Sequence, residues 1–227
     1  MDSFSDLFRS GKPALIMSLP INDEELGRAA FEEGADAVKV HINLHHNAGG
    51  EDLGDYESNR DLFDRMLFRA KGPMGIVPGA SPEAILKDID KVRASDFAFV
   101  SFYSSFLPVS ALPIRQELMA ACDKGFTLGE VAAYEKAGAS VIEASVVPTA
   151  EYGTPLNFKD LAVYGAIAGC TRLPVVVPTQ RFIEPKDVKY LAACGVRGIM
   201  IGAIVTGKTQ AGIASAVRAF RKAIDEL

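Results

Sequence analysis

All three histidines of the chain lie within six residues, shortly after a lysine at position 39. Polar and apolar residues alternate there, as in a strand with one polar and one apolar face. The polar face carries Lys39, His41 and Asn43. Burying three hydrogen-bonding side chains on one face is costly unless each finds a partner. This face is therefore the first candidate for a functional site.

The composition limits what kind of protein this is. At 227 residues, the chain has the length of one α/β-barrel, and we expect residues 1–227 to form a single domain. A net charge of −5 and a pI near 5.3 argue against binding to nucleic acid or to an anionic membrane. No run has the roughly 18 apolar residues of a membrane span. Three well-separated cysteines fit reduced thiols, so we expect a cytoplasmic protein.

Short β-rich runs alternate with amphipathic helical patterns along the whole chain, which indicates parallel βα units. We expect strands near 14–19, 37–43, 74–78, 97–102, 117–122, 140–146, 174–178 and 198–202. Helical patterns between them include 23–33, 81–91, 127–136 and 184–193. Eight such units predict a (β/α)₈ TIM barrel, with an open doubly wound sheet as the alternative.

A recurring phrase predicts which side chains face the barrel interior. Three helices end on a glycine that leads into a strand, at Gly34, Gly138 and Gly195, which precede predicted strands 2, 6 and 8. Predicted strand 4 aligns with them through Ala94. Alternate strands of such a barrel contribute to common interior layers. The alignment predicts one layer of Lys39, Phe99, Glu143 and Met200, and a second, nearer the active-site end, of His41, Ser101, Ser145 and Gly202.

Lys39 and Glu143 are thus predicted to face each other across the barrel axis. A buried amine beside a carboxylate can act as an acid–base pair, because desolvation and pairing shift both pKa values. A desolvated lysine can also attack a carbonyl to form an imine. His41 is the candidate to polarise a carbonyl or relay a proton. A structural ion pair and a satisfied core histidine are the alternatives.

The other two histidines, His45 and His46, follow the predicted strand in a loop. Together with His41, Asp52 and Asp55, they offer imidazole and carboxylate groups of the kind that bind zinc or iron. The spacing matches no helix-based zinc pattern, and solvated loop histidines are the favoured interpretation. We therefore predict no metal, and no other cofactor is expected.

Residues 202–209 match the written phosphate-loop pattern. Only 18 residues follow, which leaves no room for the strand that would carry the magnesium-binding acid of a nucleotide hydrolase. In TIM barrels, however, phosphate often rests between the loops after strands 7 and 8. The predicted phosphate-binding residues are Thr179, Gln180, Arg181, Gly202, Ala203 and Thr206. A plain strand–helix turn is the alternative.

Further polar residues lie near predicted strand ends and are expected in the pocket. They are Ser18, Asn43, Ser101, Asp123 and Ser145. The segments 44–58 and 146–158 are rich in glycine, proline and tyrosine, and we expect them to act as lids.

The end of the chain resembles the ribulose-phosphate-binding barrels. The resemblance lies in LPVVVPTQRFIEPKDV (173–188) and ACGVRGIMIGAIVTG (193–207). That superfamily includes N-acetylmannosamine-6-phosphate epimerases, indole-glycerol-phosphate synthases and pentulose-phosphate epimerases, so the resemblance implies phosphate binding. It does not imply one reaction. The strand-3 lysine and strand-7 glutamate of the first family are absent from the matching runs 74–78 and 175–178.

These features predict an enzyme that abstracts a proton next to a carbonyl of a small phosphorylated sugar or sugar acid. The expected class is an isomerase, an epimerase or a class I aldolase-like lyase. A non-catalytic phosphate-ligand-binding or regulatory barrel is the alternative. The expected partner is a small phosphorylated metabolite, with neither nucleic acid nor membrane, and a homo-oligomer is left open by the sequence.

Overall fold

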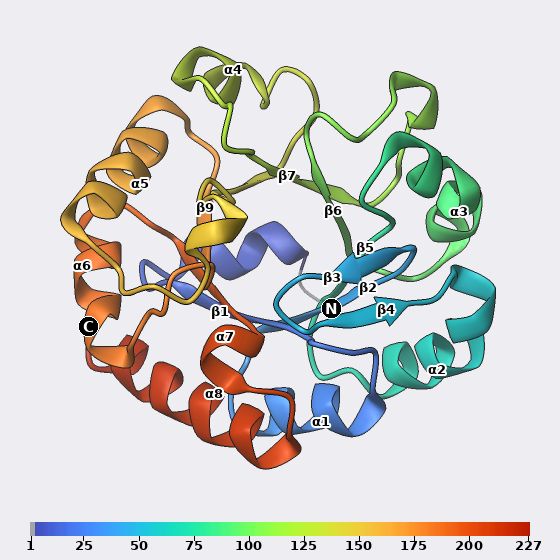
Figure 1. Cartoon of the computed structure of the whole chain (residues 1–227), viewed down its shortest axis with the longest axis horizontal. Coiled ribbons are helices and arrows are strands. Elements are labelled where there is room, and N and C mark those ends of the chain that lie inside the picture. Colours follow the sequence, from blue (N-terminus) through green and yellow to red (C-terminus); the bar gives the residue numbers. More distant parts are fainter. Residues whose placement is uncertain (1–2) are drawn as a thin grey trace.

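Eight parallel strands close into a barrel in the computed structural model, which describes residues 3–227 (Figure 1). The barrel strands are β1 (Ala14–Ser18), β2 (Ala37–His41), β5 (Met74–Val77), β6 (Phe99–Tyr103), β7 (Glu117–Ala121), β8 (Val141–Glu143), β9 (Val175–Pro178) and β10 (Gly198–Ile201). Each predicted strand has its counterpart. The predicted (β/α)₈ barrel is confirmed, and the open sheet is excluded because β1 pairs with both β2 and β10.

Helices surround the barrel and follow most of its strands (Figure 1). They are α1 (Glu24–Glu32), α2 (Tyr56–Arg69), α3 (Pro82–Ala94), α4 (Leu128–Ala133), α5 (Phe158–Cys170), α6 (Val188–Ala193), α7 (Ala203–Thr206) and α8 (Gln210–Asp225). Short 3₁₀ helices are η1 (Phe4–Arg9), η2 (Val109–Ala111), η3 (Thr149–Glu151) and η4 (Pro185–Asp187). Side-chain caps at Asp23, Ser81 and Asn157 fix where α1, α3 and α5 begin. Within residues 3–227, no helix is long and apolar enough to cross a membrane.

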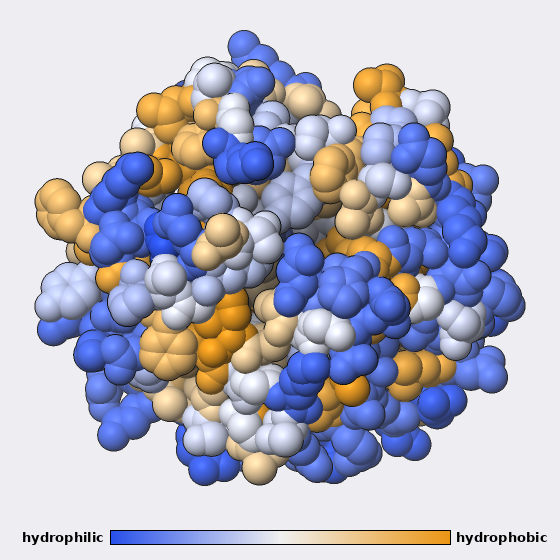
Figure 2. Space-filling view, viewed as in Figure 1, coloured by the Kyte–Doolittle hydropathy of each residue, from blue (hydrophilic) through white to orange (hydrophobic). Residues whose placement is uncertain are grey.

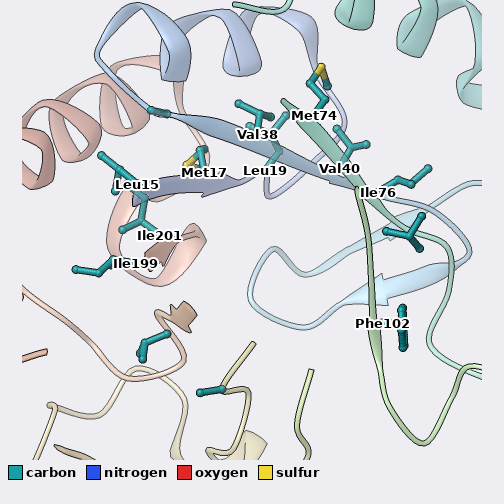
Figure 3. Packing of buried hydrophobic residues seen from close by; sticks show 14 of the residues in the cluster. Leu15, Met17, Leu19, Val38, Val40, Met74, Ile76, Phe102, Ile199 and Ile201 are labelled. Atoms are coloured by element: carbon teal, nitrogen blue, oxygen red, sulfur yellow. The ribbon is translucent and has the colours of Figure 1, made fainter. Parts of the chain in front are cut away.

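The outward faces of the strands pack against the helices as one apolar layer (Figure 3). Val38 and Val40 of β2 and Ile199 and Ile201 of β10 are fully buried there. The sequence pattern assigned these residues to the helix side of the sheet, which leaves the alternating residues of each strand to fill the barrel.

The interior at the amino-terminal ends of the strands is apolar and plugged by η1. The Phe4 ring stacks on Phe99 of β6 with centroids 3.7 Å apart. Gly75 makes room for this plug, because a Cβ at that position would lie 2.1 Å from the Phe99 ring. The backbone N–H of Ser5 donates to the Glu117 carboxylate at 3.1 Å and anchors η1 to β7. We call this part of the barrel the closed end.

A two-stranded antiparallel hairpin follows β2, where the sequence predicted a loop. It consists of β3 (Leu44–His46) and β4 (Glu51–Leu53). Together with η3 and α7, this hairpin lies over the opposite end of the barrel (Figure 1).

Candidate active site

The carboxyl ends of the strands surround a cavity of about 180 Å³. In a view toward this end of the barrel, apolar and polar residues both lie around the cavity opening (Figure 2). The hairpin and the residues around Tyr152 and Ile204 complete the cavity wall. The cavity is small beside typical ligand pockets, so it suits a compact metabolite.

The Lys39–Glu143 pair forms the polar floor of this cavity. Lys39 Nζ lies 3.0 Å from Glu143 Oε2, and the two side chains are 5% and 8% exposed. Ser101 Oγ donates to the same carboxylate oxygen at 2.9 Å, and Ser145 Oγ donates to Glu143 Oε1 at 2.7 Å. The predicted contact across the barrel axis is therefore present, and it includes two of the predicted serines.

The predicted membership of the two layers is wrong for one strand. β6 is displaced by two residues from the alignment through Ala94, so Ser101 takes the level beside Glu143 that was assigned to Phe99. Phe99 lies lower, against Phe4. The same displacement brings Tyr103 into the cavity wall near Ser145. Ala94 ends α3 without a glycine, so the linker into β6 differs from the other three.

The surroundings of Glu143 favour its ionised form. Burial alone would raise the pKa of this carboxyl, but the Lys39 charge and the hydrogen bonds from Ser145, Lys39 and Ser101 outweigh burial and lower its pKa below the usual value. An ionised carboxylate beside an open cavity can accept a proton from a bound molecule.

His41 stands beside this pair and is kept neutral. Burial lowers its pKa well below the usual value, and the nearby His46 and Lys39 lower it further. Its Nε2 lies 3.3 Å from Ser18 Oγ, and Nδ1 is buried without a protein partner. Asn22 fixes the end of β2, since its side chain donates to the His41 carbonyl at 2.7 Å and accepts from the His41 N–H at 3.1 Å.

The other two histidines differ from each other. His45 is exposed and pairs with Asp52 at 2.8 Å, as expected for a solvated residue. His46 is half-buried and turns inward toward the cavity, with its ring centroid 4.6 Å from that of His41. The prediction of a solvated His46 is therefore wrong. Asp55 caps α2. Within residues 3–227, no three His, Cys, Asp or Glu side chains are grouped to hold a metal ion.

Two predicted pocket residues lie outside the cavity. Asn43 has a positive φ of 55°, which turns its side chain away from the barrel to donate to Asp88 at 2.9 Å. Asp123 shapes the turn after β7, where it accepts from Ser105 Oγ at 3.1 Å and Gly125 N at 2.8 Å. Both belong to segments past a strand end, where the two-residue period no longer applies.

Four of the six residues predicted to bind phosphate line the cavity: Thr179, Gln180, Gly202 and Ala203. Thr179 Oγ1 accepts a hydrogen bond from the Gly202 N–H at 3.0 Å, so this N–H already has a partner. Gly202 precedes α7, whose first N–H groups have no acceptor within the helix. Gln180 Nε2 donates to the Tyr152 hydroxyl at 2.7 Å.

The other two lie elsewhere. Arg181 is held by acids, with Nε 3.0 Å from Asp160 and a terminal nitrogen 2.7 Å from Glu151, so its charge is engaged away from the cavity. Thr206 is buried, and its hydroxyl donates to the Gly207 carbonyl at 2.8 Å. The placement of Arg181 and Thr206 in a phosphate cradle is wrong for this reason.

The stretch that matches the phosphate-loop pattern is not a single loop. Residues 203–206 form α7, and Thr209 caps α8 by accepting from Gly212 N at 3.1 Å. The Lys208 ammonium lies 3.0 Å from Glu51 on the hairpin. The rejection of a nucleotide-hydrolase site from the sequence agrees with this geometry.

The residues of the cavity or its support that sequence reasoning missed include Tyr103, Tyr152 and Asn22. Burial raises the pKa of Tyr103 far above its usual value, and Tyr152 and Glu143 add to this, so the phenol stays protonated. Tyr103 follows Ser101 by two residues, so a correct alignment of β6 would have included it. Tyr152 lies in the segment 146–158, which was predicted as a lid without singling out this residue, and Asn22 lies in a connecting segment that no pattern marked.

Fold and site together define a (β/α)₈ barrel with a polar cavity at the carboxyl ends of its strands. No family model and no curated protein matches the chain. Solved structures do. A thiamine phosphate pyrophosphorylase from Pyrococcus furiosus is 19% identical, with 96% of this chain and 98% of that chain covered and a TM-score of 0.64.

Two tryptophan synthase structures are also similar. A mutant α-subunit from the hyperthermophile P. furiosus is 12% identical over 93% of this chain and 98% of that chain, with a TM-score of 0.71. A ligand-free tryptophan synthase from M. tuberculosis is 13% identical over 98% and 99%, with a TM-score of 0.70. At these identities the likeness establishes the fold.

Proposed function

We propose that this barrel is an enzyme that removes a proton next to a carbonyl of a small phosphorylated sugar or sugar acid. The buried Lys39–Glu143 pair on the cavity floor carries the proposal. Replacing a buried ion pair by apolar residues is often neutral or stabilising, so stability alone does not explain why this pair is present. The pair lies toward the carboxyl ends of the strands, where barrel enzymes have their active sites, and this position supports a catalytic role.

Each residue of the floor has a role in this chemistry. The Glu143 carboxylate accepts the proton from carbon. The Lys39 amine either neutralises the charge that develops on the carbonyl oxygen or attacks the carbonyl carbon and forms an imine with loss of water. Neutral His41 donates a hydrogen bond to the same oxygen or relays a proton. Isomerisation, epimerisation and aldol cleavage share this first step.

The phosphate group is proposed to bind between the ends of β9 and β10. Gly202 and Ala203 line the cavity there, beside Thr179 and Gln180 of the segment after β9. The resemblance of residues 173–207 to ribulose-phosphate-binding barrels supports the same end of the cavity. One structural neighbour is named for a phosphorylated compound, thiamine phosphate.

Deuterium exchange tests the reaction. Small phosphorylated ketoses and 2-keto sugar acids are incubated with the protein in D₂O, and NMR follows the hydrogen next to the carbonyl. We expect exchange with at least one compound in the wild type and none with Glu143→Gln. In parallel, borohydride reduction followed by mass spectrometry detects an imine on Lys39, with Lys39→Arg as the control. Binding without exchange or adduct would contradict the proposal and favour a non-catalytic binding barrel.

A further inference from the structure

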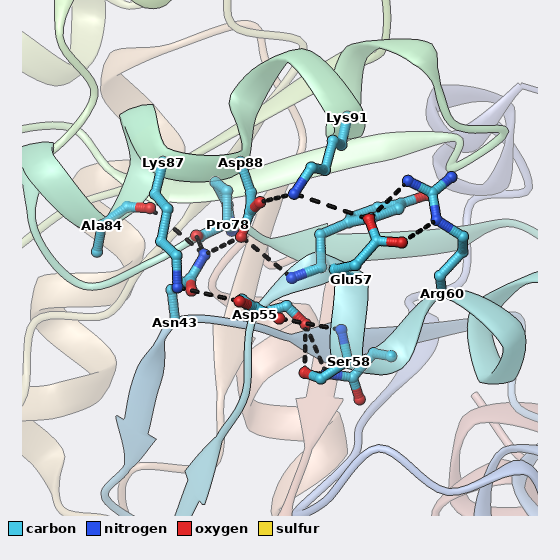
Figure 4. A network of polar contacts seen from close by, with 12 residues as sticks. Asn43, Asp55, Glu57, Ser58, Arg60, Pro78, Ala84, Lys87, Asp88 and Lys91 are labelled. Carbon is cyan, nitrogen blue, oxygen red and sulfur yellow. Dashed lines mark hydrogen bonds and ion pairs between the residues drawn. The ribbon is translucent and has the colours of Figure 1, made fainter.

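The hairpin of β3 and β4 is fixed at its base by one buried acid, Asp88 of α3 (Figure 4). Asp88 is 1% exposed. Its Oδ2 accepts from Asn43 Nδ2 at 2.9 Å and from the Tyr56 N–H at 3.1 Å, while Oδ1 pairs with Lys91 at 2.8 Å. Asn43 immediately precedes the hairpin and Tyr56 begins the helix after it, so one carboxylate holds both flanking segments.

The base of the hairpin is closed by backbone as well. The Asn43 N–H donates to the Gly54 carbonyl at 2.9 Å. Near the turn, Glu51 lies 3.0 Å from Lys208 in the segment after α7. The hairpin is thus held at its base and near its turn, and His46 lies at the turn end, directly opposite Glu51 in the register of the two strands.

The turn of the hairpin sets the chemical form of His46. The Gly49 N–H donates to His46 Nδ1 at 2.9 Å, and because a backbone N–H can only donate, Nδ1 must be the unprotonated nitrogen. The proton of the neutral ring is therefore on Nε2. A Cβ at position 49 would lie 2.5 Å from the Pro20 carbonyl oxygen and 2.6 Å from His46 Nδ1, so the close approach requires glycine.

The surroundings of His46 oppose a second proton. Burial lowers its pKa to about 4, and the nearby Lys39, His45 and Lys208 contribute. Its ring lies against His41, which is also neutral. Two neutral imidazoles therefore line the same wall of the cavity.

We propose that the hairpin is a fixed cover of the cavity, which places His46 in the wall as a neutral Nε2–H donor for a carbonyl or hydroxyl oxygen of the ligand. Asp88 is the positioning residue that holds the hairpin there. This proposal rests on the proposed function only in assuming that the ligand presents a carbonyl or hydroxyl oxygen to His46. His46 would then be a ligand-binding residue that the hairpin contributes, whereas Lys39, His41 and Glu143 lie on barrel strands.

Histidine NMR of the ¹⁵N-labelled protein tests this without any substrate, so its outcome is separate from that of the exchange experiment. The chain has three histidines, and His46→Gln assigns the signal. We expect His46 to be protonated on Nε2 at neutral pH and to remain neutral at pH 5. In Asp88→Asn, the amide places a donor against Asn43, the Tyr56 N–H or Lys91, which loosens the base of the hairpin. His46 should then become more exposed to water, and its pKa should rise by one unit or more.

The matched control is Asp90→Asn, which changes an exposed acid on the same helix and should leave His46 as in the wild type. Gly49→Ala is the second variant and decides the matter if Asp88→Asn does not fold, because it displaces His46 through the turn and leaves the barrel strands untouched. A proton on Nδ1, a wild-type titration near pH 6.5, or an unchanged titration in Gly49→Ala would overturn the proposal.

Discussion

The two ends of the barrel use the same strands for opposite purposes. At the closed end, β6 contributes Phe99 to an aromatic stack with Phe4. Two residues further along, Ser101 hydrogen-bonds Glu143 in the cavity floor. On β2, Ala37 belongs to the apolar interior and Lys39 to the polar floor. A single step of one side-chain period therefore separates the residues that stabilise the barrel from those positioned for chemistry.

The largest effect should come from replacing the polar floor as a unit. In Lys39→Met/Glu143→Leu, we expect turnover to fall by at least roughly 10²–10⁴-fold, as for loss of a general acid or base. Because an apolar pair removes two buried charges together, the free energy of unfolding should be unchanged or about 1–4 kcal/mol higher. Urea unfolding and turnover measure the two quantities. A large loss of stability would show that the pair is structural.

The converse change is made at the closed end. Phe4→Ala should lower the free energy of unfolding by about 3–5 kcal/mol, because it leaves a cavity against the Phe99 ring. Activity per folded molecule should remain near that of the wild type, since the floor is untouched. Phe68→Ala is the control, because Phe68 is 90% exposed and should change stability little. A selective loss of activity in Phe4→Ala would erase the distinction between the two ends.

The open end should also make stability depend on pH through His46. The folded pKa is about 4 against an ordinary value of 6.5, so between these pH values the unfolded chain binds more protons than the folded one. This contribution is complete above pH 6.5 and is lost as the pH falls toward 4. The shift alone corresponds to about 3 kcal/mol, and solvent screening of this half-buried side chain reduces the contribution to the order of 2 kcal/mol. Unfolding of His46→Gln between pH 4 and 7 should show a weaker pH dependence than the wild type.

The smallest effect concerns the proposed phosphate end. Gly202→Asp should weaken binding of a phosphorylated ligand about tenfold, which corresponds to roughly 1.4 kcal/mol of charge repulsion. Gly202→Ala is the matched control, since a Cβ there makes only an ordinary contact of 3.5 Å with the Ser18 carbonyl oxygen. Calorimetry with phosphorylated and unphosphorylated forms of one sugar compares them. Equal losses in both variants would mean that the position senses size and not charge.

Much of the fold and half of the site are visible in the sequence because strands have a fixed period. Alternation along β2 and β8 is enough to bring Lys39 and Glu143 together, since both lie inside regular strands. Alternation also gave the correct face of β6, but the alignment through Ala94 placed Phe99 at the level that Ser101 occupies, because the linker from α3 differs from the other three. A two-residue error keeps the correct face but changes the level, so it is invisible to a pattern of alternation.

Residues beyond the strand ends were not predictable in this way. Arg181 follows β9 and has the charge expected of a phosphate ligand, yet two acids from η3 and α5 engage it. His46 was assigned to solvent, but a hairpin turns it back over the cavity. Both outcomes depend on contacts between segments far apart in the chain, which a single sequence does not reveal.

The plug of η1 also has a consequence for how the chain folds. The Ser5 N–H donates a hydrogen bond to Glu117, which lies 112 residues later in the sequence, and Phe4 stacks on Phe99. During synthesis, residues 4–9 therefore emerge long before their partners and expose two phenylalanines until β6 and β7 have formed. Contacts of such long range form slowly, and exposed aromatic groups favour aggregation in the meantime. The chain is thus expected to depend most on chaperones before its middle strands are complete.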